Sequence, residues 1–346
     1  MAKALISNEL PVPPHFDPTK TAGVWRVPYQ PLAEGAQDWA SQYNIRPAGD
    51  DALKIALIII DVQITFCIPG FELFVAGRSG SGAVDDTRRL CEFIYRNLGT
   101  LSQITATLDS HEAIQIFHPI FLVNQQGAHP TPYTSVSGED IQQGRWKFNP
   151  AVAKSLGINE EFGQRQMLHY TEELKRRGKY EHTIWPYHAM LGGIGHALVP
   201  SLEEAIFFHS IARSSQADIQ LKGQNPFTEN YSAIGPEVLD GPDGKPLAQK
   251  NQSFLQKVID YDIVIIAGQA KSHCLGWTVA DLLTEIRALD ASLTDKIYLL
   301  EDTSSAVVIP GVVDYTNAAD QAFQKFKDAG MHLVQSTNPI ANWPGL

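Results

Sequence analysis

The sequence predicts an α/β protein with three layers, in which helices cover both faces of one six-stranded, mostly parallel, doubly wound sheet. Two observations predict this fold. From residue 55 onward, short β-branched runs alternate with longer stretches of helical spacing, which is typical of parallel strands buried on both faces. Six such runs joined by crossover helices favour a single open sheet.

The expected elements alternate in order along the chain. The strands are expected at Lys54 to Asp61, Gln103 to Asp109, Asp218 to Lys222, Asp262 to Gly268, Lys296 to Glu301 and His332 to Gln335. The helices are expected at Ala83 to Asn97, Ser201 to Arg213, Gln249 to Asp260, Leu275 to Leu289 and Asn317 to Ala329. The last of these helices has apolar residues at the i, i+3, i+4, i+7 spacing of one buried face, namely Ala319, Ala322, Phe323 and Phe326.

The chain is expected to divide into an arm and one large domain. Residues 1–50 are rich in Pro, Asn, Gln and Trp and lack helical or alternating periodicity, so we expect an irregular arm that wraps a neighbouring surface. Residues 51–346 form the sheet domain in this interpretation. Within it, Gly, Pro and Gln interrupt the alternation over residues 124–182, which indicates an insertion with a charged helical piece from Glu160 to Arg177.

The composition is that of a globular protein and argues against several partners. Of 346 residues, 44% are hydrophobic and 19% charged, and the net charge is −11. The longest basic run is Lys175-Arg176-Arg177, so neither nucleic acid nor an anionic membrane is an expected partner. Three scattered cysteines do not suggest a disulfide framework, and the apolar stretch Ala4-Leu5-Ile6 is too short for a signal peptide. We therefore expect a soluble, cytoplasmic protein.

Four chemically useful residues follow the ends of predicted strands. Asp61, Asp109 and Lys222 end three of the strands, and Cys274 closely follows a fourth. Because ligands gather at the carboxyl ends of parallel strands, these positions predict a site at one edge of the sheet.

Cys274 is expected at the turn between a strand and the start of a helix. The helix dipole favours a thiolate there, and the amides from Ala270 to Cys274 would suit an oxyanion. Asp61 would take the thiol proton and Lys222 would stabilise the anions while Cys274 attacks a carbonyl. From the residues alone, a buried inert thiol, an N-cap aspartate and a solvated lysine stay open as alternatives.

A second cluster has the residue types of metal ligands. Asp109 and His111 lie two residues apart on a turn after a strand, with His118 further along and His188 after the insertion. Such a pair can face one ion, and a third ligand would leave positions open for water or substrate. The chain has 11 histidines, so an accidental Asp-x-His pair also stays open.

Five ordered segments resemble the motifs of the isochorismatase-like cysteine hydrolases, and most closely those of the nicotinamidase branch. They are Asp61-Val62-Gln63-Ile64-Thr65-Phe66-Cys67-Ile68-Pro69-Gly70, Asp109-Ser110-His111, Trp185-Pro186-Tyr187-His188, Lys222-Gly223 followed by Tyr231-Ser232-Ala233, and Gly268-Gln269-Ala270-Lys271-Ser272-His273-Cys274. The resemblance extends over roughly residues 55–335 apart from the insertion. It implies the isochorismatase-like form of the three-layer fold.

The resemblance implies catalytic roles for several motif residues. Asp61, Lys222 and Cys274 match a catalytic triad, and the backbone N–H groups of Ala270 and Cys274 match an oxyanion hole. In such enzymes the peptide bond that corresponds to Gln269–Ala270 is cis. Lys222 is expected to lower the pKa values of Cys274 and Asp61 by charge proximity.

The resemblance also implies binding roles. The residues that match metal ligands are Asp109, His111 and His188, with His118 as a further candidate. The implied cofactor is a divalent metal, zinc first, with iron(II) or manganese(II) as alternatives. Phe66 and Trp185 match aromatic walls around the substrate ring. Cys67 and Cys91 are interpreted as structural.

The implied function is a cysteine amidohydrolase that cleaves a small carboxamide through a Cys274 thioester. Nicotinamide, giving nicotinate and ammonia, is the first expectation. Isochorismatase-type or other small-amide hydrolysis on the same fold, and an inactive binding protein, are the alternatives. Analogy with the family implies a homo-oligomer, and the insertion is expected to roof or reshape the pocket.

Overall fold

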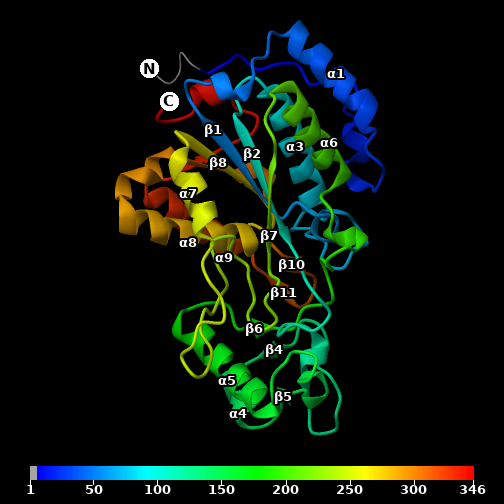
Figure 1. The fold of residues 1–346 in the computed structure, drawn as a ribbon, viewed down its shortest axis with the longest axis vertical. Coiled ribbons are helices and arrows are strands. Elements are labelled where there is room, and N and C mark those ends of the chain that lie inside the picture. The colour runs from blue at the N-terminus through cyan, green and yellow to red at the C-terminus, as the bar shows by residue number, and fades with distance from the viewer. Residues whose placement is uncertain (1–5) are drawn as a thin grey trace.

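The structure is a computed structural model that describes residues 6–346. Figure 1 shows a central sheet with helices on both faces and a smaller lobe at one end of the molecule. Residues 1–5 of the arm, including Ala4 and Leu5, lie outside the described residues.

The central sheet has six strands in the order β12-β9-β8-β1-β2-β7, and every neighbouring pair is parallel. The strands are β1 (Ile55–Ile60), β2 (Gln103–Asp109), β7 (Asp218–Lys222), β8 (Ile263–Gly268), β9 (Ile297–Leu300) and β12 (His332–Val334). This confirms the predicted fold class, and each predicted strand agrees within one residue at either end.

The middle of the sheet is buried on both faces. All six residues of β1 are buried. Ile55, Leu57 and Ile59 join one hydrophobic core, whereas Ile58 and Ile60 join the other. Successive side chains of a strand point to opposite faces, so an unbroken apolar run can serve two helix layers at once.

Two helix layers complete the fold (Figure 1). The helices α3 (Gly82–Arg96) and α6 (Pro200–Ala212) contribute to the core on one face of the sheet. The helices α7 (Gln252–Asp260), α8 (Cys274–Leu289) and α9 (Thr316–Asp328) contribute to the core on the other face. All five predicted helices are present, and a single turn, α2 (Ile64–Cys67), follows β1.

The prediction that residues 1–50 form an irregular arm is wrong in one part. The arm contains α1 (Tyr29–Gln42), which packs against α6. The residues that face the core, Leu32 and Ala36, are few and one is small, so their hydrophobic signal was weak. Pro31 lies in the first turn of α1, where a proline has no intrahelical hydrogen bond to lose.

Most of the region from 124 to 182 lies in the lobe at the lower end of Figure 1. Its elements, with β3 just before it, are β3 (Leu122–Val123), β4 (Ser135–Val136), α4 (Gly138–Gln142), β5 (Lys147–Phe148), α5 (Glu160–Arg176) and β6 (His182–Thr183). These elements enclose a hydrophobic core of their own, which includes Phe148, Met167 and Tyr170. A short hairpin, β10 (Val308–Ile309) and β11 (Val313–Asp314), precedes α9.

Within residues 6–346, no helix combines the length and the apolar character needed to cross a membrane.

Candidate active site

Neighbouring strands bring the motif residues to one edge of the sheet. Asp109 pairs in register with Lys222 at the ends of β2 and β7, and β1 pairs with β8 up to the last residue of each strand. Because these strands are parallel, Asp61 leaves the sheet beside the turn that connects β8 to Cys274.

The Lys222 ammonium connects the acidic groups with the thiol. Its Nζ lies 2.8 Å from Asp61 Oδ2, 3.0 Å from Asp109 Oδ1 and 3.6 Å from Cys274 Sγ. It also donates a hydrogen bond to the Asn230 carbonyl at 2.8 Å. The side chains of Lys222, Asp61, Asp109 and Cys274 are all buried. Residues that are distant along the chain therefore form one compact group of acid, amine and thiol.

Burial and neighbouring charges shift the pKa values of Asp61, Lys222 and Cys274. It raises the pKa of Asp61, and it raises the pKa of Cys274 well above its usual value, although the Lys222 charge opposes both shifts. Burial disfavours the Lys222 cation, but Asp109 and Asp61 raise the pKa of Lys222 well above its usual range. The Lys222 charge acts to lower both pKa values, as expected, but desolvation outweighs it, so the net shift of each pKa is upward.

The turn before α8 presents free backbone donors beside the thiol. The peptide bond Gln269–Ala270 is cis. Within residues 6–346, the N–H groups of Ala270 and Cys274 donate to no protein acceptor. Cys274 is the first residue of α8, where amides lack intrahelical partners. Two unpaired donors at a helix start suit a developing oxyanion.

Side chains from α3 hold this turn in place. Gln269 Nε2 donates to Asp86 Oδ2 at 2.9 Å, and Gln269 Oε1 accepts from the Ser305 amide at 3.3 Å. Asp86 in turn forms a 2.7 Å ion pair with Arg89. These contacts fix the residue before Ala270 from both sides.

A second group beside Lys222 has metal-ligand character. Ligand atoms of Asp109, His111 and His188 all lie within 4.8 Å of one another, and the three residues are buried. Asp109 Oδ2 lies 2.9 Å from His111 Nε2 and 3.7 Å from His188 Nε2. Burial opposes the ionisation of Asp109, but His111 and Lys222 hold the pKa of Asp109 well below its usual range.

The backbone orients both imidazoles toward this point. His111 Nδ1 lies 3.3 Å from the Gly223 carbonyl, and His188 Nδ1 lies 2.8 Å from the Pro186 carbonyl, so each Nε2 faces Asp109. Second-sphere hydrogen bonds of this kind are typical of metal-binding histidines. Gly223 has φ +87°, and a Cβ there would lie 2.8 Å from Asp109 Oδ1. The residues present therefore fit a divalent metal.

Two further buried groups lie close to this cluster. His118 is not among the three grouped ligands; its Nδ1 lies 3.2 Å from the Ala113 carbonyl, and its Nε2 has no partner within residues 6–346. Glu229, which sequence reasoning missed, lines the cavity, and burial raises its pKa to about 8. It lies in a segment without secondary structure, and its only sequence signal is its place between Lys222 and Tyr231.

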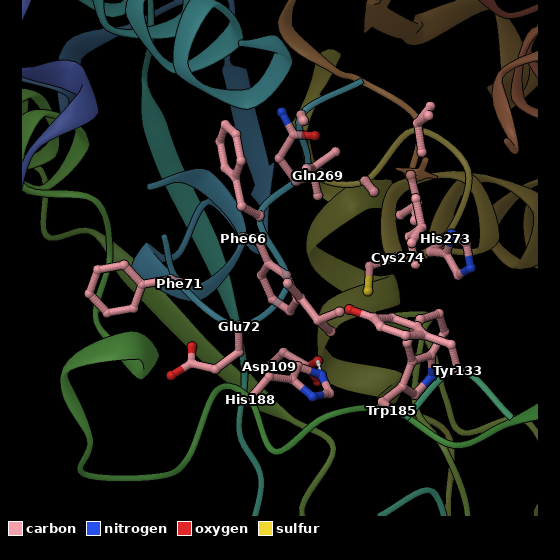
Figure 2. Close-up of a pocket in the computed structure, with 18 of the residues that line it drawn as sticks. Phe66, Phe71, Glu72, Asp109, Tyr133, Trp185, His188, Gln269, His273 and Cys274 are labelled. Atoms are coloured by element: carbon pink, nitrogen blue, oxygen red, sulfur yellow. Dashed lines mark ion pairs between the residues drawn. The ribbon is translucent and has the colours of Figure 1, made fainter. Parts of the chain in front are cut away.

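A cavity of about 280 Å³ opens onto Cys274. Figure 2 shows the thiol between Phe66 and His188 on one side and the rings of Trp185 and Tyr133 on the other. Trp185 Nε1 donates to the Tyr231 hydroxyl at 3.0 Å, which fixes the indole plane. Phe66 and Trp185 therefore both line the cavity in which the substrate ring is expected to bind.

The remaining cysteines lie away from this cavity. Cys67 and Cys91 are completely buried and are not among its lining residues. Burial raises the pKa of both thiols. Both side chains pack in the hydrophobic core beside α3.

Comparison with known proteins identifies the fold. No protein-family model matches the sequence, and no curated protein matches it. The chain is similar in structure to an Acinetobacter baumanii nicotinamidase and pyrazinamidase, with a TM-score of 0.50 and 19% identity over 83% of this chain and 99% of that one. The fold is that of the isochorismatase-like hydrolases.

Two other solved structures are similar over comparable lengths. The yeast nicotinamidase has a TM-score of 0.49 and 18% identity, covering 81% of this chain and 99% of its own. A Pyrococcus horikoshii pyrazinamidase, solved in complex with zinc, has a TM-score of 0.43 and 19% identity, covering 82% of this chain and 99% of its own. The similarity to the Acinetobacter structure confirms the isochorismatase-like fold that the sequence motifs imply.

Proposed function

We propose that this chain is a cysteine amidohydrolase that converts a small carboxamide to a carboxylate and ammonia, and that nicotinamide is a substrate. The observation that carries the proposal is the convergence of a thiol, an amine, a carboxylate and two backbone amides at one edge of the sheet, where Ala270 and Cys274 line the cavity. A thiol lies 3.6 Å from an amine, the amine lies 2.8 Å from a carboxylate, and two backbone amides next to the thiol lack acceptors. Each group meets one requirement of acyl transfer.

Asp61 is the proton carrier in this proposal. It takes the Cys274 proton as the sulfur attacks the amide carbonyl, and the amides of Ala270 and Cys274 hold the oxyanion. Asp61 then gives that proton to the departing nitrogen as the C–N bond breaks, which releases ammonia and leaves a Cys274 thioester. Burial raises the pKa of Asp61, which makes its carboxylate a better proton acceptor than an exposed aspartate.

Water completes the cycle. Asp61 removes a proton from a water that attacks the thioester carbonyl, and the C–S bond then breaks to give the carboxylic acid, which releases its proton to solvent and becomes the carboxylate. The sulfur leaves as a thiolate and recovers a proton from Asp61, which restores the starting state. Lys222 keeps its charge throughout and stabilises the anionic forms of Asp61 and Cys274.

A divalent metal, zinc in our proposal, would be held by Asp109, His111 and His188 and would supply a Lewis acid for the substrate's ring nitrogen. Phe66 and Trp185 would hold the ring from its sides. The role of these residues is to orient the carboxamide toward Cys274.

The cavity argues against isochorismatase-type hydrolysis. The substrate of that reaction carries two carboxylates, which need cationic partners. Within residues 6–346, the side chains that line the cavity include no Lys or Arg, but they include Glu72 and Glu229. A neutral carboxamide suits this lining better.

The decisive test is ammonia release from nicotinamide and a panel of other small amides. We expect turnover of nicotinamide by the wild-type protein, no turnover by Cys274→Ala, and nearly wild-type turnover by the matched control Cys91→Ala. Treatment with a chelator should raise KM more than it lowers kcat, because the metal is proposed to orient the ring. Full activity of Cys274→Ala would refute the proposal.

A further inference from the structure

The cavity extends well beyond the part that a single ring would occupy. Its volume of about 280 Å³ approaches the roughly 300–1,000 Å³ of pockets for drug-sized ligands. Beyond Phe66 and Trp185 it is bounded by two segments, residues 71–76 and 307–310, which we call the outer walls. Figure 2 shows Phe71 on the far side of Phe66 from Cys274.

The outer walls are mainly apolar and incompletely buried. The half-buried apolar residues in them are Phe71, Leu73, Phe74, Val307, Val308 and Ile309. The one charged residue in the outer walls, Glu72, accepts a 2.9 Å hydrogen bond from the Thr65 hydroxyl. A ligand group that covered these side chains would gain from removing apolar surface from water.

Both walls are fixed to the rest of the site. The Leu73 amide donates to the Thr65 carbonyl at 3.2 Å, and the Val75 amide donates to the Phe66 carbonyl at 2.8 Å. The first wall is thereby tied to the helical turn that carries the ring-facing Phe66.

The second wall includes β10 of the β10–β11 hairpin, and two sets of contacts hold this hairpin and the start of α9 in place. Arg78 Nε forms a 2.7 Å ion pair with Asp314, and Arg78 Nη2 donates to Asn317 Oδ1 at 3.0 Å. The ring of Tyr315 also packs 5.0 Å from the ring of Tyr180, centroid to centroid. A preformed apolar wall needs little ordering when a ligand binds.

We propose that the outer walls form a subsite for an apolar substituent, so that the preferred substrates are ring carboxamides that carry an alkyl or aryl group. This inference rests on the proposed function for the position of the carboxamide at Cys274. The outer walls offer few polar partners for a charged or hydroxylated tail, so the selectivity is for apolar extension.

Binding to the Cys274→Ala protein tests the subsite without turnover. The probes are two series, para-alkylbenzamides and nicotinamides alkylated meta to the amide, each from methyl to butyl, measured by calorimetry. In at least one series we expect Kd to fall about fourfold per added methylene, which is on the order of 60-fold from methyl to butyl. A Kd that is independent of chain length in both series would overturn the proposal.

Variants on the walls locate the effect. In the Cys274→Ala background we test Ile309→Asp and Phe71→Ser, which lie on opposite walls. Each should raise the Kd of the butyl compound at least about tenfold, whereas the Kd of nicotinamide should change by less than about twofold. The matched control is Val312→Asp, because Val312 is 62% exposed, belongs to the same hairpin loop and does not line the cavity. Equal losses in the control and in Ile309→Asp would also overturn the proposal.

Turnover by the wild-type protein separates this inference from the proposed function. Hydrolysis of nicotinamide without tighter binding of the alkyl compounds would refute the subsite alone. Tight, chain-length-dependent binding without hydrolysis of any amide would refute the proposed function and leave the subsite standing.

Discussion

Asp61 is the residue on which the proposed chemistry depends most. Its side chain is completely buried, and its Oδ1 accepts a 2.5 Å hydrogen bond from Thr107. The Asp61 amide donates to the same hydroxyl oxygen at 3.1 Å, which fixes the backbone at φ +46°. Only Oδ2 is left to face Lys222 and the thiol. This geometry aims one carboxylate oxygen at the place where a proton must move.

Replacing that oxygen should stop proton transfer while keeping the shape of the site. We expect Asp61→Asn to lower kcat about 10²–10⁴-fold, because the amide cannot accept the thiol proton. Substrate affinity of the folded variant should change little, which steady-state kinetics and calorimetry will measure. Asp85→Asn, at a partly exposed position on α3, is the matched control. An Asp61→Asn enzyme with near-normal kcat would exclude Asp61 as the proton carrier.

Residues at strand ends could be predicted from sequence, because apolar runs mark where the strands stop. Asp109 and Lys222 each end a strand as expected. The direction of the Cys274 pKa shift could not be predicted, because it depends on how completely the surrounding chain excludes water. Glu229 was missed since it lies in an irregular segment that no periodicity places near the site.

At the scale of elements, the turn from β8 to the start of α8 carries the Cys274 thiol and the backbone N–H groups of Ala270 and Cys274. Gly268 ends β8 with φ +117°, and a Cβ at this position would lie 2.1 Å from the Ile60 carbonyl oxygen. The strand β1 runs directly alongside. Only a residue without a side chain lets the turn leave the sheet at this point.

A methyl group at position 268 should therefore cost far more than an unfavourable φ alone. We expect Gly268→Ala to lower the free energy of unfolding by on the order of 3 kcal/mol or more, measured by denaturant titration. The matched control is Gly157→Ala, because Gly157 has φ +66° with no atom within 4 Å of the added Cβ. There the loss should be about 1 kcal/mol. Equal losses would show that the contact with Ile60 is not decisive.

Regular elements with strong apolar patterns were predictable, whereas α1 was not. The strand β1 is apolar throughout, but α1 has only Leu32 and Ala36 buried. The outer walls were missed for a related reason. Their apolar residues line a cavity and not a core, and nothing in the local sequence distinguishes the two environments.

At the scale of the whole molecule, segments outside the sheet pack onto it from two directions. The arm crosses α3 and α6, where Tyr95 donates a 3.1 Å hydrogen bond to Glu204 and lies 3.2 Å from His15 Nε2. At the other end, Tyr180 donates to the Ser272 carbonyl at 3.0 Å, two residues before the thiol. The arm thus adds to the core, whereas the lobe reaches the candidate site.

The contact between the arm and α6 should make stability depend on pH. Burial raises the pKa of Glu204 above its usual value of 4.5, so the folded protein holds this proton more tightly than the unfolded chain. The proton on Glu204 therefore stabilises the folded state. This stabilisation is complete below the pKa that Glu204 has in the unfolded chain, and it is lost as the pH rises through the pKa that Glu204 has in the folded protein.

We therefore expect the unfolding free energy of the wild type to fall relative to that of Glu204→Gln between about pH 4 and pH 7. The slope should not exceed about 1.4 kcal/mol per pH unit, the value for one proton. Denaturant titrations across this range will measure it. Glu161→Gln, at a side chain that is 82% exposed, should show no such trend. A constant difference for Glu204→Gln would contradict the prediction.

The central claim is that the Cys274 sulfur forms a covalent acyl intermediate with an amide substrate. Rapid quenching of the wild-type protein with nicotinamide, followed by peptide mass spectrometry, tests it most directly. We predict a transient acyl adduct on the peptide that contains Cys274, absent from Cys274→Ala. Sustained turnover by the wild type with no adduct on that peptide, together with turnover by Cys274→Ala, would contradict the account.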